Sequence, residues 1–172
     1  MNIFTQEHNF VQEKYKTKEQ AEHLLNLLKR EVIEEDASNY LESLQYFFFA
    51  TSNKQGHTNV NFKGVRSGKL IKVLDEKHLI FPDYKGNGIF HGIGDIMSNP
   101  NVSLLCIDFS KNIRVKISGT AQIIDDADTV SKYSDILNTN DAERIIKITV
   151  RYLIPNCSKQ LSVVKDSILN PH

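Results

Sequence analysis

The sequence predicts a mainly β fold, either a small antiparallel barrel or a highly twisted sheet with helices at its periphery. Two observations predict it. Between residues 44 and 153, apolar runs rich in aromatic and β-branched residues alternate with clusters of turn residues. Most connections between these runs are too short for the crossovers of a parallel sheet, which disfavours an α/β fold. The expected order is four strands, a helix, two strands, a helix and a final strand.

The bulk properties narrow the class of protein. The 172 residues fit one domain, and 21 basic residues balance 21 acidic ones, so no net charge attracts nucleic acid or an anionic membrane. No run of about 18 apolar residues is present, and no secretory signal is visible, so we expect neither a membrane span nor export. The two cysteines lack metal-ligand spacing. Cys106 lies in an apolar run and should be a small buried residue, which fits a reduced, cytoplasmic protein.

We expect a single domain over residues 1–172, with a helical extension at 1–43, a barrel core at 44–124, and a helix, a closing strand and a tail at 125–172. In the extension, residues 17–35 are predicted to form one helix. Thr17 can cap it, with Gln20 three residues further on as in a capping box. Apolar residues at helical spacing predict that one face packs while the other is solvated; they are Ala21, Leu24, Leu25, Leu28 and Val32.

The barrel elements follow in order. An aromatic run predicts the first strand, and a glycine-ended turn separates it from a second strand whose residues alternate between polar and apolar. Two hairpins flank a helix that should stop before Pro100, because a residue preceding proline avoids the helical region. The predicted strands are residues 44–52, 59–62, 70–74, 78–81, 102–109, 113–124 and 145–153, and the predicted helices are residues 89–98 and 125–137.

A glycine-containing loop before the first barrel helix is the first candidate site. Gly86 and Gly88 would let backbone amides approach a ligand, and the helix start behind them supplies N–H groups that suit a phosphate. Lys85 can add a charge, and His91 is the histidine nearest to this loop. The alternative is an ordinary strand-to-helix loop. The residues proposed to contact a ligand here are Pro82, Asp83, Tyr84, Lys85, Asn87, Gly88 and His91.

Two strands carry the other candidate residues. Asn59, Asn61 and Lys63 share one strand face, where amides and an ammonium group could bind a planar, polar-edged ligand, while Val60 and Phe62 take the other face. A solvent-facing strand edge would give the same pattern. A second polar face carries Arg114 and Lys116, and its alternative is again a solvated surface. The six histidines show no metal-ligand spacing, so no metal site is expected.

Taken in order, these motifs resemble the pyridoxamine 5′-phosphate oxidase-related family of FMN-binding split barrels. The resemblance covers roughly residues 44–124, with a weaker echo at Pro155-Asn156-Cys157-Ser158-Lys159. The matching pieces are Phe49-Ala50-Thr51-Ser52, Gly56, Asn59 to Gly64, Val73-Leu74-Asp75, Leu79 to Asn87, Gly94-Asp95-Ile96, Asn99-Pro100, Leu104 to Phe109 and Arg114 to Gly119.

The resemblance implies a six-stranded split barrel that forms a homodimer with FMN at the subunit interface. It also implies cofactor contacts from Lys63, from the stretch 82–87 and from Arg114, with Lys116 beside Arg114; the full expected set adds Asn59, Asn61, Phe62, Gly88 and His91. One departure is visible. Relatives often carry an arginine or lysine just after the loop for the FMN phosphate and a serine where this chain has Gly92, whereas this chain offers His91.

The resemblance therefore implies an FMN-dependent oxidoreductase acting on a small molecule that the sequence does not name. A second hypothesis is a non-catalytic flavin- or haem-binding protein on the same fold, with His91 as the nearest candidate for an axial haem ligand. A deazaflavin in place of FMN, or a barrel without a cofactor, are the remaining alternatives.

Overall fold

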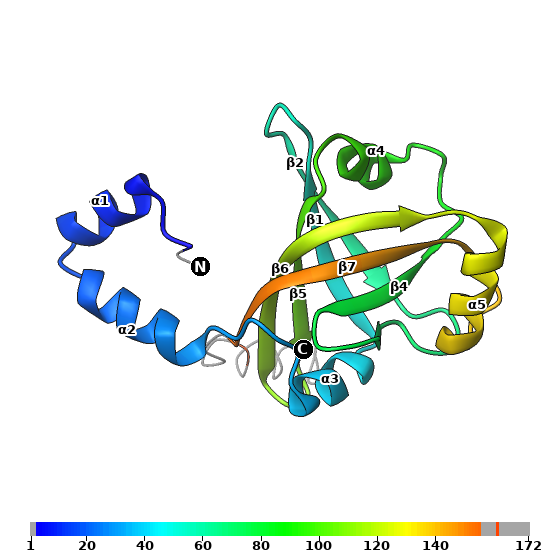
Figure 1. Cartoon of the computed structure of the whole chain (residues 1–172), viewed down its shortest axis with the longest axis horizontal. Coiled ribbons are helices and arrows are strands. Elements are labelled where there is room, and N and C mark those ends of the chain that lie inside the picture. The colour runs from blue at the N-terminus through cyan, green and yellow to red at the C-terminus, as the bar shows by residue number, and fades with distance from the viewer. Residues whose placement is uncertain (1–2, 156–160, 162–172) are drawn as a thin grey trace, which may run out of the picture.

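Seven strands form one antiparallel sheet in the part of the chain that the computed structural model describes, residues 3–155 and 161 (Figure 1). Their order across the sheet is β2-β1-β5-β6-β7-β4-β3. The strands are β1 (Tyr46–Ser52), β2 (Thr58–Gly64), β3 (Lys72–Val73), β4 (His78–Tyr84), β5 (Asn101–Asp108), β6 (Ile113–Ile124) and β7 (Ala142–Pro155).

The predicted order of strands and barrel helices is confirmed from β1 to β7. The strand number implied by the family resemblance is wrong, because the sheet has seven strands rather than six. The additional strand is short: β3 contains two residues and pairs only with Leu79 and Ile80 of β4. Beyond that pairing β4 has an unpaired edge, where Pro82 without an N–H group is tolerated.

The long pair β6–β7 carries much of the curvature of the sheet (Figure 1). A register shift lies between Ser118 and Gly119, as in a β-bulge. A Cβ atom on Gly119 would stand 2.3 Å from the Thr149 carbonyl oxygen, so this position requires glycine. The close approach of the two backbones lets β6 and β7 stay paired from Ile124 and Ile145 to Val115 and Pro155.

Strand alternation builds the core beneath the sheet. Phe47 and Phe49 of β1 are buried and meet the ring of Phe81 from β4 edge-on, with centroids 5.1 and 5.2 Å apart. Cys106 is fully buried, as predicted, and this burial raises the pKa of its thiol to about 12. The second cysteine, Cys157, lies outside the described residues.

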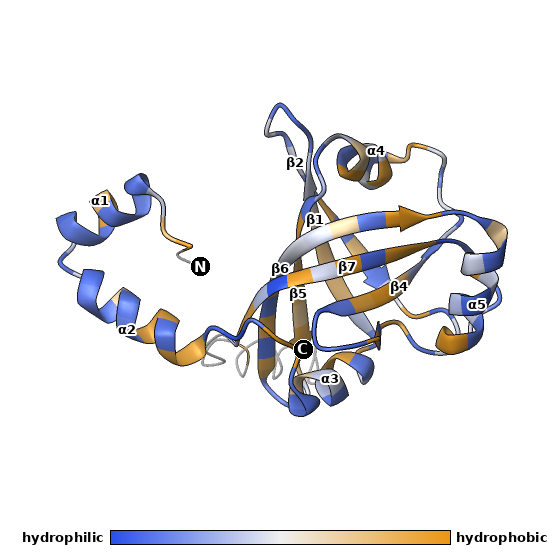
Figure 2. Ribbon diagram, viewed as in Figure 1, coloured by the Kyte–Doolittle hydropathy of each residue, from blue (hydrophilic) through white to orange (hydrophobic). Residues whose placement is uncertain are grey.

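Of the five helices within residues 3–155, three lie against the sheet and two stand away from it (Figure 1). α3 (Glu35–Glu42), α4 (His91–Ser98) and α5 (Ala127–Leu137) each bury at least one residue. Helices α1 (Gln6–Lys14) and α2 (Lys18–Leu28) bury none and project from the barrel as a helical pair. Figure 2 shows apolar residues along α2, towards its end nearest the barrel.

The single helix predicted over residues 17–35 is wrong in extent and in packing. α2 ends at Leu28, and Lys29 is extended. The Arg30 backbone then pairs with Leu153 of β7, and the Ile33 amide donates to the Glu76 carbonyl, so pairing with the barrel replaces the last helical turns. Thr17 precedes α2 but makes no side-chain capping bond. The capping box is instead at Thr5 and begins α1, a helix that the apolar spacing did not reveal.

Among the described residues, no helix combines the length and the apolar character that a membrane crossing requires.

Candidate functional site

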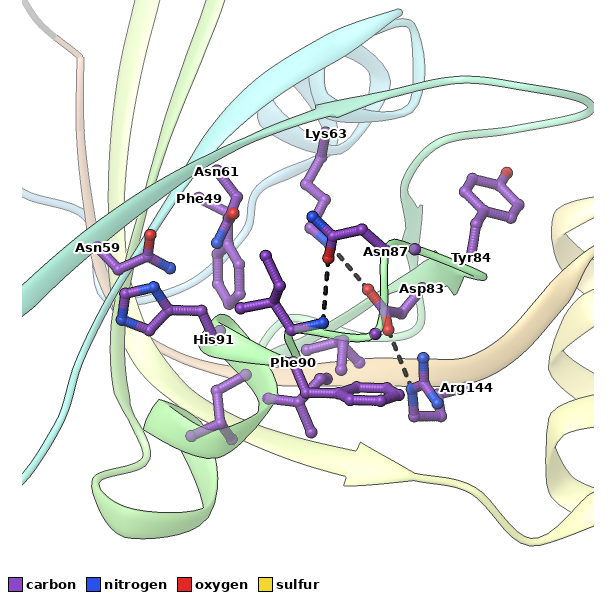
Figure 3. A pocket seen from close by; sticks show the side chains of 17 residues that line it. Phe49, Asn59, Asn61, Lys63, Asp83, Tyr84, Asn87, Phe90, His91 and Arg144 are labelled. Carbon is purple, nitrogen blue, oxygen red and sulfur yellow. Dashed lines mark hydrogen bonds and ion pairs between the residues drawn. The ribbon is translucent and has the colours of Figure 1, made fainter.

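A cavity of about 330 Å³ opens between β2, β4, β7 and the start of α4 (Figure 3). Its volume lies in the range of small-molecule and cofactor sites. The lining residues are Phe49, Asn59, Asn61, Lys63, Asp83, Tyr84, Gly86, Asn87, Gly88, Ile89, Phe90, His91, Gly92, Ile93, Ile96, Arg144 and Ile146.

Strand β2 supplies one wall of the cavity through its polar face. Asn59, Asn61 and Lys63 all line it, because residues at alternate positions of a strand share a face. Val60 and Phe62 point to the opposite side, and their side chains are 64% and 63% exposed. The predicted division of the strand is therefore confirmed, and it places Phe62 outside the cavity.

Asn59 is held by a buried chain of hydrogen bonds. Its Nδ2 donates to Thr51 Oγ1 of β1 at 3.3 Å, and the Thr51 hydroxyl donates to Asp95 Oδ2 of α4 at 2.7 Å. Thr51 and Asp95 are almost fully buried. Because these bonds join three elements, they fix α4 over the polar end of the cavity and orient the Asn59 amide.

Asn61 lies against the backbone of α4. A Cβ atom on Gly92 would stand 3.1 Å from Asn61 Nδ2 and 3.8 Å from Asn59 Nδ2. A larger side chain at this position would therefore crowd both amides. Glycine at position 92 therefore leaves room for the asparagine face of β2.

Part of the predicted glycine loop is strand rather than loop. Pro82, Asp83 and Tyr84 belong to β4 and pair with β7, so the loop begins only at Lys85. Pro82 is buried within the sheet and does not line the cavity. The pairing of β4 with β7 extends to Tyr84 because β7 starts at Ala142, three residues before the predicted strand.

Asp83 joins two cations at the cavity wall (Figure 3). Lys63 Nζ donates to its Oδ1 at 2.8 Å, and Arg144 Nε donates to its Oδ2 at 3.0 Å. The Asp83 side chain is 10% exposed, against 23% for Lys63 and 16% for Arg144. One nearly buried carboxylate thus holds an ammonium and a guanidinium group from two other strands.

Arg144 is the functional candidate that the sequence analysis missed. It lies directly opposite Asp83 in the β4–β7 register, and its guanidinium group stands 5.1 Å from the centre of the Phe90 ring. Its Nη2 also donates to Glu143 at 3.1 Å. The available signal in the sequence was the charged pair Glu143 and Arg144 directly before a β-branched run. Only the order of strands in the sheet brings Arg144 to the cavity.

The loop and the start of α4 complete the wall. Asn87 Oδ1 accepts a hydrogen bond from the Ile89 amide at 3.1 Å, which shapes the turn before the helix. Gly88 and Phe90 both have positive φ, 82° and 53°, and Phe90 precedes α4 without a side-chain cap. His91, at the first position of α4, lines the cavity beside Asn59 (Figure 3).

The structure brings together most of the predicted site residues, but not all of them. Asn59, Asn61, Lys63, Asp83, Tyr84, Asn87, Gly88 and His91 line the cavity. Phe62, Pro82, Lys85, Arg114 and Lys116 do not. Arg114 and Lys116 lie on β6, which pairs with β5 and β7 away from this cavity. Among the described residues, no group of three His, Cys, Asp or Glu side chains could hold a metal ion.

The donors and acceptors of the cavity suit a flat ligand with a polar edge and an anionic group. Amide groups on β2 can pair with ring nitrogens and carbonyls, and the two cations can bind a phosphate or an electron-rich ring edge. Phe49, Ile93 and Ile146 give the cavity an apolar floor. FMN has each of these features, so the residues present fit this cofactor.

Comparison with known proteins agrees with the fold. The sequence model of the pyridoxamine 5′-phosphate oxidase family matches residues 33–157. No curated protein sequence matches the chain.

Solved structures resemble it at low identity. A HupZ variant from Group A Streptococcus has a TM-score of 0.58 and 16% identity over 72% of this chain and 99% of that protein. A Lactobacillus delbrueckii protein named for pyridoxamine 5′-phosphate oxidase has a TM-score of 0.58 and 19% identity, with 74% and 98% covered. An FMN-binding protein from Syntrophomonas wolfei has a TM-score of 0.54 and 6% identity, with 86% and 97% covered.

Proposed function

This chain belongs to the pyridoxamine 5′-phosphate oxidase family, and on that premise we propose that it binds FMN and acts as a flavin-dependent oxidoreductase on a small molecule. The observation that carries the proposal is the cavity itself, where the amides of Asn59 and Asn61 and the cations Lys63 and Arg144 face one space. Bound FMN would supply the hydride or electron transfer. The protein would supply position, charge and exclusion of water.

Each group of residues has a distinct proposed role. Asn59 and Asn61 orient the ring by hydrogen bonds, and their own positions are set by Thr51 and by the missing side chain at Gly92. Lys63 places a positive charge near the ring edge or the phosphate. The loop around Gly88 offers backbone amides, since glycine has no side chain and a ligand can approach its backbone closely.

We further propose a homodimer with the flavin at the subunit interface, in the cytoplasm. The exposed apolar side chains of Val60 and Phe62 on the outer face of β2, directly behind the amide wall, support this assembly. In such an assembly Arg114 and Lys116 could reach a cofactor from the second subunit, which would reconcile their predicted role with their position on β6, away from this cavity.

A non-catalytic binding protein is the second candidate function. The observation in its favour is the exposed ring of His91 at the cavity, which could be an axial ligand for haem. A Soret band in the purified protein that disappears in His91→Ala would favour haem. Rapid reduction of a bound flavin by NADH or NADPH would favour the oxidoreductase.

The first test is the absorption spectrum of the purified protein, followed by titration of the flavin-free form with FMN. We expect a yellow protein or saturable FMN binding, and a ligand at about 100 times its dissociation constant should stabilise the fold by about 2.7 kcal/mol. Static light scattering on the same samples should report a dimer. A colourless protein whose melting temperature does not rise with FMN would contradict the proposal.

A pair of lysine variants locates the binding. Lys63→Gln should weaken FMN at least about tenfold, because it removes a charged hydrogen-bond donor from the cavity. Lys54→Gln, in the exposed turn between β1 and β2, removes the same charge elsewhere and should leave the affinity unchanged.

A further inference from the structure

We propose that Lys63 and Arg144 form one anion-binding subsite for the phosphate group of the ligand, and that Asp83 is the counter-ion which holds both cations in place and competes with the phosphate for them. This inference deepens the proposed function and rests on it as far as the flavin is concerned. Arg144 would then supply the basic group that the family resemblance leads one to expect just after the loop, where this chain has His91.

The geometry of the three charges carries the proposal. Each oxygen of Asp83 accepts from a different cation, at 2.8 Å from Lys63 and 3.0 Å from Arg144. All three side chains line the same cavity and are largely buried. Asp83 alone can balance only one of the two cations. The second carboxylate near Arg144, Glu143, is 39% exposed and therefore more strongly screened by water than Asp83.

Both cations keep donors for a ligand. Lys63 has three N–H donors, and its described hydrogen bond to Asp83 uses one of them. Arg144 has five donors, and its hydrogen bonds within the described part of the chain engage Nε with Asp83 and Nη2 with Glu143. A phosphate oxygen can therefore add bonds to both side chains, and the strongest binding follows when it replaces the Asp83 carboxylate.

Arg144 is fixed more firmly than a surface arginine. Asp83 is its register partner on β4, and the Phe90 ring packs against its guanidinium group at 5.1 Å. A planar group held by an ion pair and an aromatic ring loses little freedom on binding an anion. The cation is thus positioned by the sheet and not by the loop.

Asp83 should have opposite effects on the stability of the ligand-free protein and on its affinity for a phosphate. Without a ligand it stabilises the fold, because it pairs with two partly buried cations. With a phosphate present it competes for the same donors. Removal of its charge should therefore lower the stability of the ligand-free protein and raise its affinity for a phosphate.

The experiment compares FMN with riboflavin, which has the same ring but no phosphate. Arg144→Gln should weaken FMN about ten- to a hundredfold while riboflavin changes little, and Arg144→Lys should recover part of the loss. Arg151→Gln is the matched control, since Arg151 lies on the same strand and bonds to Asn101 away from the cavity. Equal losses for the two flavins, or equal behaviour of Arg144→Gln and Arg151→Gln, would overturn the subsite.

Ribose 5-phosphate separates this inference from the proposed function. If the wild-type protein binds neither flavin, the proposed function fails, and the subsite is tested alone by titrating ribose 5-phosphate with ³¹P resonance detection. Arg144→Gln must then weaken the phosphate, and an unchanged titration would overturn the subsite.

Asp83→Asn tests the counter-ion. The variant should melt at a lower temperature than the wild type and bind ribose 5-phosphate about tenfold more tightly, since a neutral amide competes less for the cations. If Asp83→Asn does not fold, Lys63→Gln measures the same competition, because Asp83 then pairs with Arg144 alone. The affinity for phosphate should fall by more than about a hundredfold, which is more than the loss of one donor explains. Weaker phosphate binding by folded Asp83→Asn, or a smaller loss in Lys63→Gln, would overturn the competition.

Discussion

Glu42 shows how a single side chain can tie a helix to the sheet. It ends α3 and receives Lys69 Nζ at 2.7 Å and Lys72 Nζ at 2.8 Å, together with the Val73 amide of β3 at 3.2 Å. Burial acts to raise the pKa of Glu42, but these hydrogen bonds outweigh it and lower the pKa below the ordinary value of 4.5. The ionised carboxylate is therefore the form that stabilises the fold.

Replacement of Glu42 by glutamine should make stability less dependent on pH. A depressed carboxyl pKa contributes stability above the ordinary value of 4.5, and this contribution disappears as the pH falls through the folded-state pKa. At pH 7 we expect Glu42→Gln to cost about 1 to 2 kcal/mol of unfolding free energy, and the cost should shrink in acid. Urea unfolding of both proteins at pH 7 and at several acidic pH values measures this cost.

Glu76→Gln is the matched control, because this exposed residue lies in the hairpin that Glu42 braces. A cost for Glu42→Gln that stays constant into acid would contradict the assignment.

At the residue scale, the sequence predicted the side chains whose position depends on local geometry alone. The alternation of β2 places Asn59, Asn61 and Lys63 on one face whatever the rest of the fold does. Arg144 could not be found in this way, since it reaches the cavity only because β7 pairs with β4, a strand distant in sequence. Lys116 satisfies the same alternation rule on β6 and lies elsewhere.

The pair β6–β7 is the element that depends most on one residue. At the register shift after Ser118, the backbone of β7 comes so close that a side chain at Gly119 has no room. Strand propensity alone would favour a β-branched residue here, but the close contact between the two backbones leaves room only for glycine.

Substitution of Gly119 by alanine should lower the unfolding free energy by about 3 kcal/mol, because the new Cβ atom would meet the backbone of Thr149 and not a side chain that can move. Gly94→Ala serves as the control: Gly94 lies inside α4, and a Cβ there meets no atom within 4 Å. Loss of the backbone freedom of glycine in a helix should raise stability by up to about 1 kcal/mol. Equal effects of the two substitutions in thermal or urea unfolding would contradict this account of the bulge.

The helices of the N-terminal extension show the limit of periodicity at the element scale. The spacing of Leu24, Leu25 and Leu28 correctly predicted helix, but it also predicted packing, and α2 buries none of its residues. Helical periodicity reports a face that is able to pack, not the surface that it meets. The end of α2 was misjudged for a related reason, since backbone bonds from Arg30 to β7 have no local signature.

For the whole molecule, the chain divides into a barrel that carries the cavity and a helical pair that stands apart (Figure 1). A chain that lacks residues 1–28 should therefore keep its urea midpoint, with a change in unfolding free energy below about 0.5 kcal/mol. A chain that lacks residues 1–44 should not fold, because it loses the buried side chains of Ile33, Leu41 and Leu44. A large loss of stability in the shorter truncation would contradict this division of the chain.

The sequence of strands and helices along the barrel was predictable because each turn is local, whereas the order of strands in the sheet was not. The pairing of β7 with both β6 and β4 joins segments far apart in the chain, and no pattern within either segment encodes it. The six strands implied by the family resemblance also left out β3, because this strand pairs with β4 through only two residues.

The three charges at the cavity also restrict the routes by which this protein can evolve. Loss of Lys63 or Arg144 first would leave Asp83 paired with the remaining cation. Loss of Asp83 first would leave the partly buried Lys63 without this counter-ion and Arg144 with only the more exposed Glu143, at a cost of about 3–5 kcal/mol. A lineage that abandons the anion would therefore shed a cation before the carboxylate. Because Asp83 and Arg144 are also register partners, Arg144 should be substituted together with Asp83 or before it.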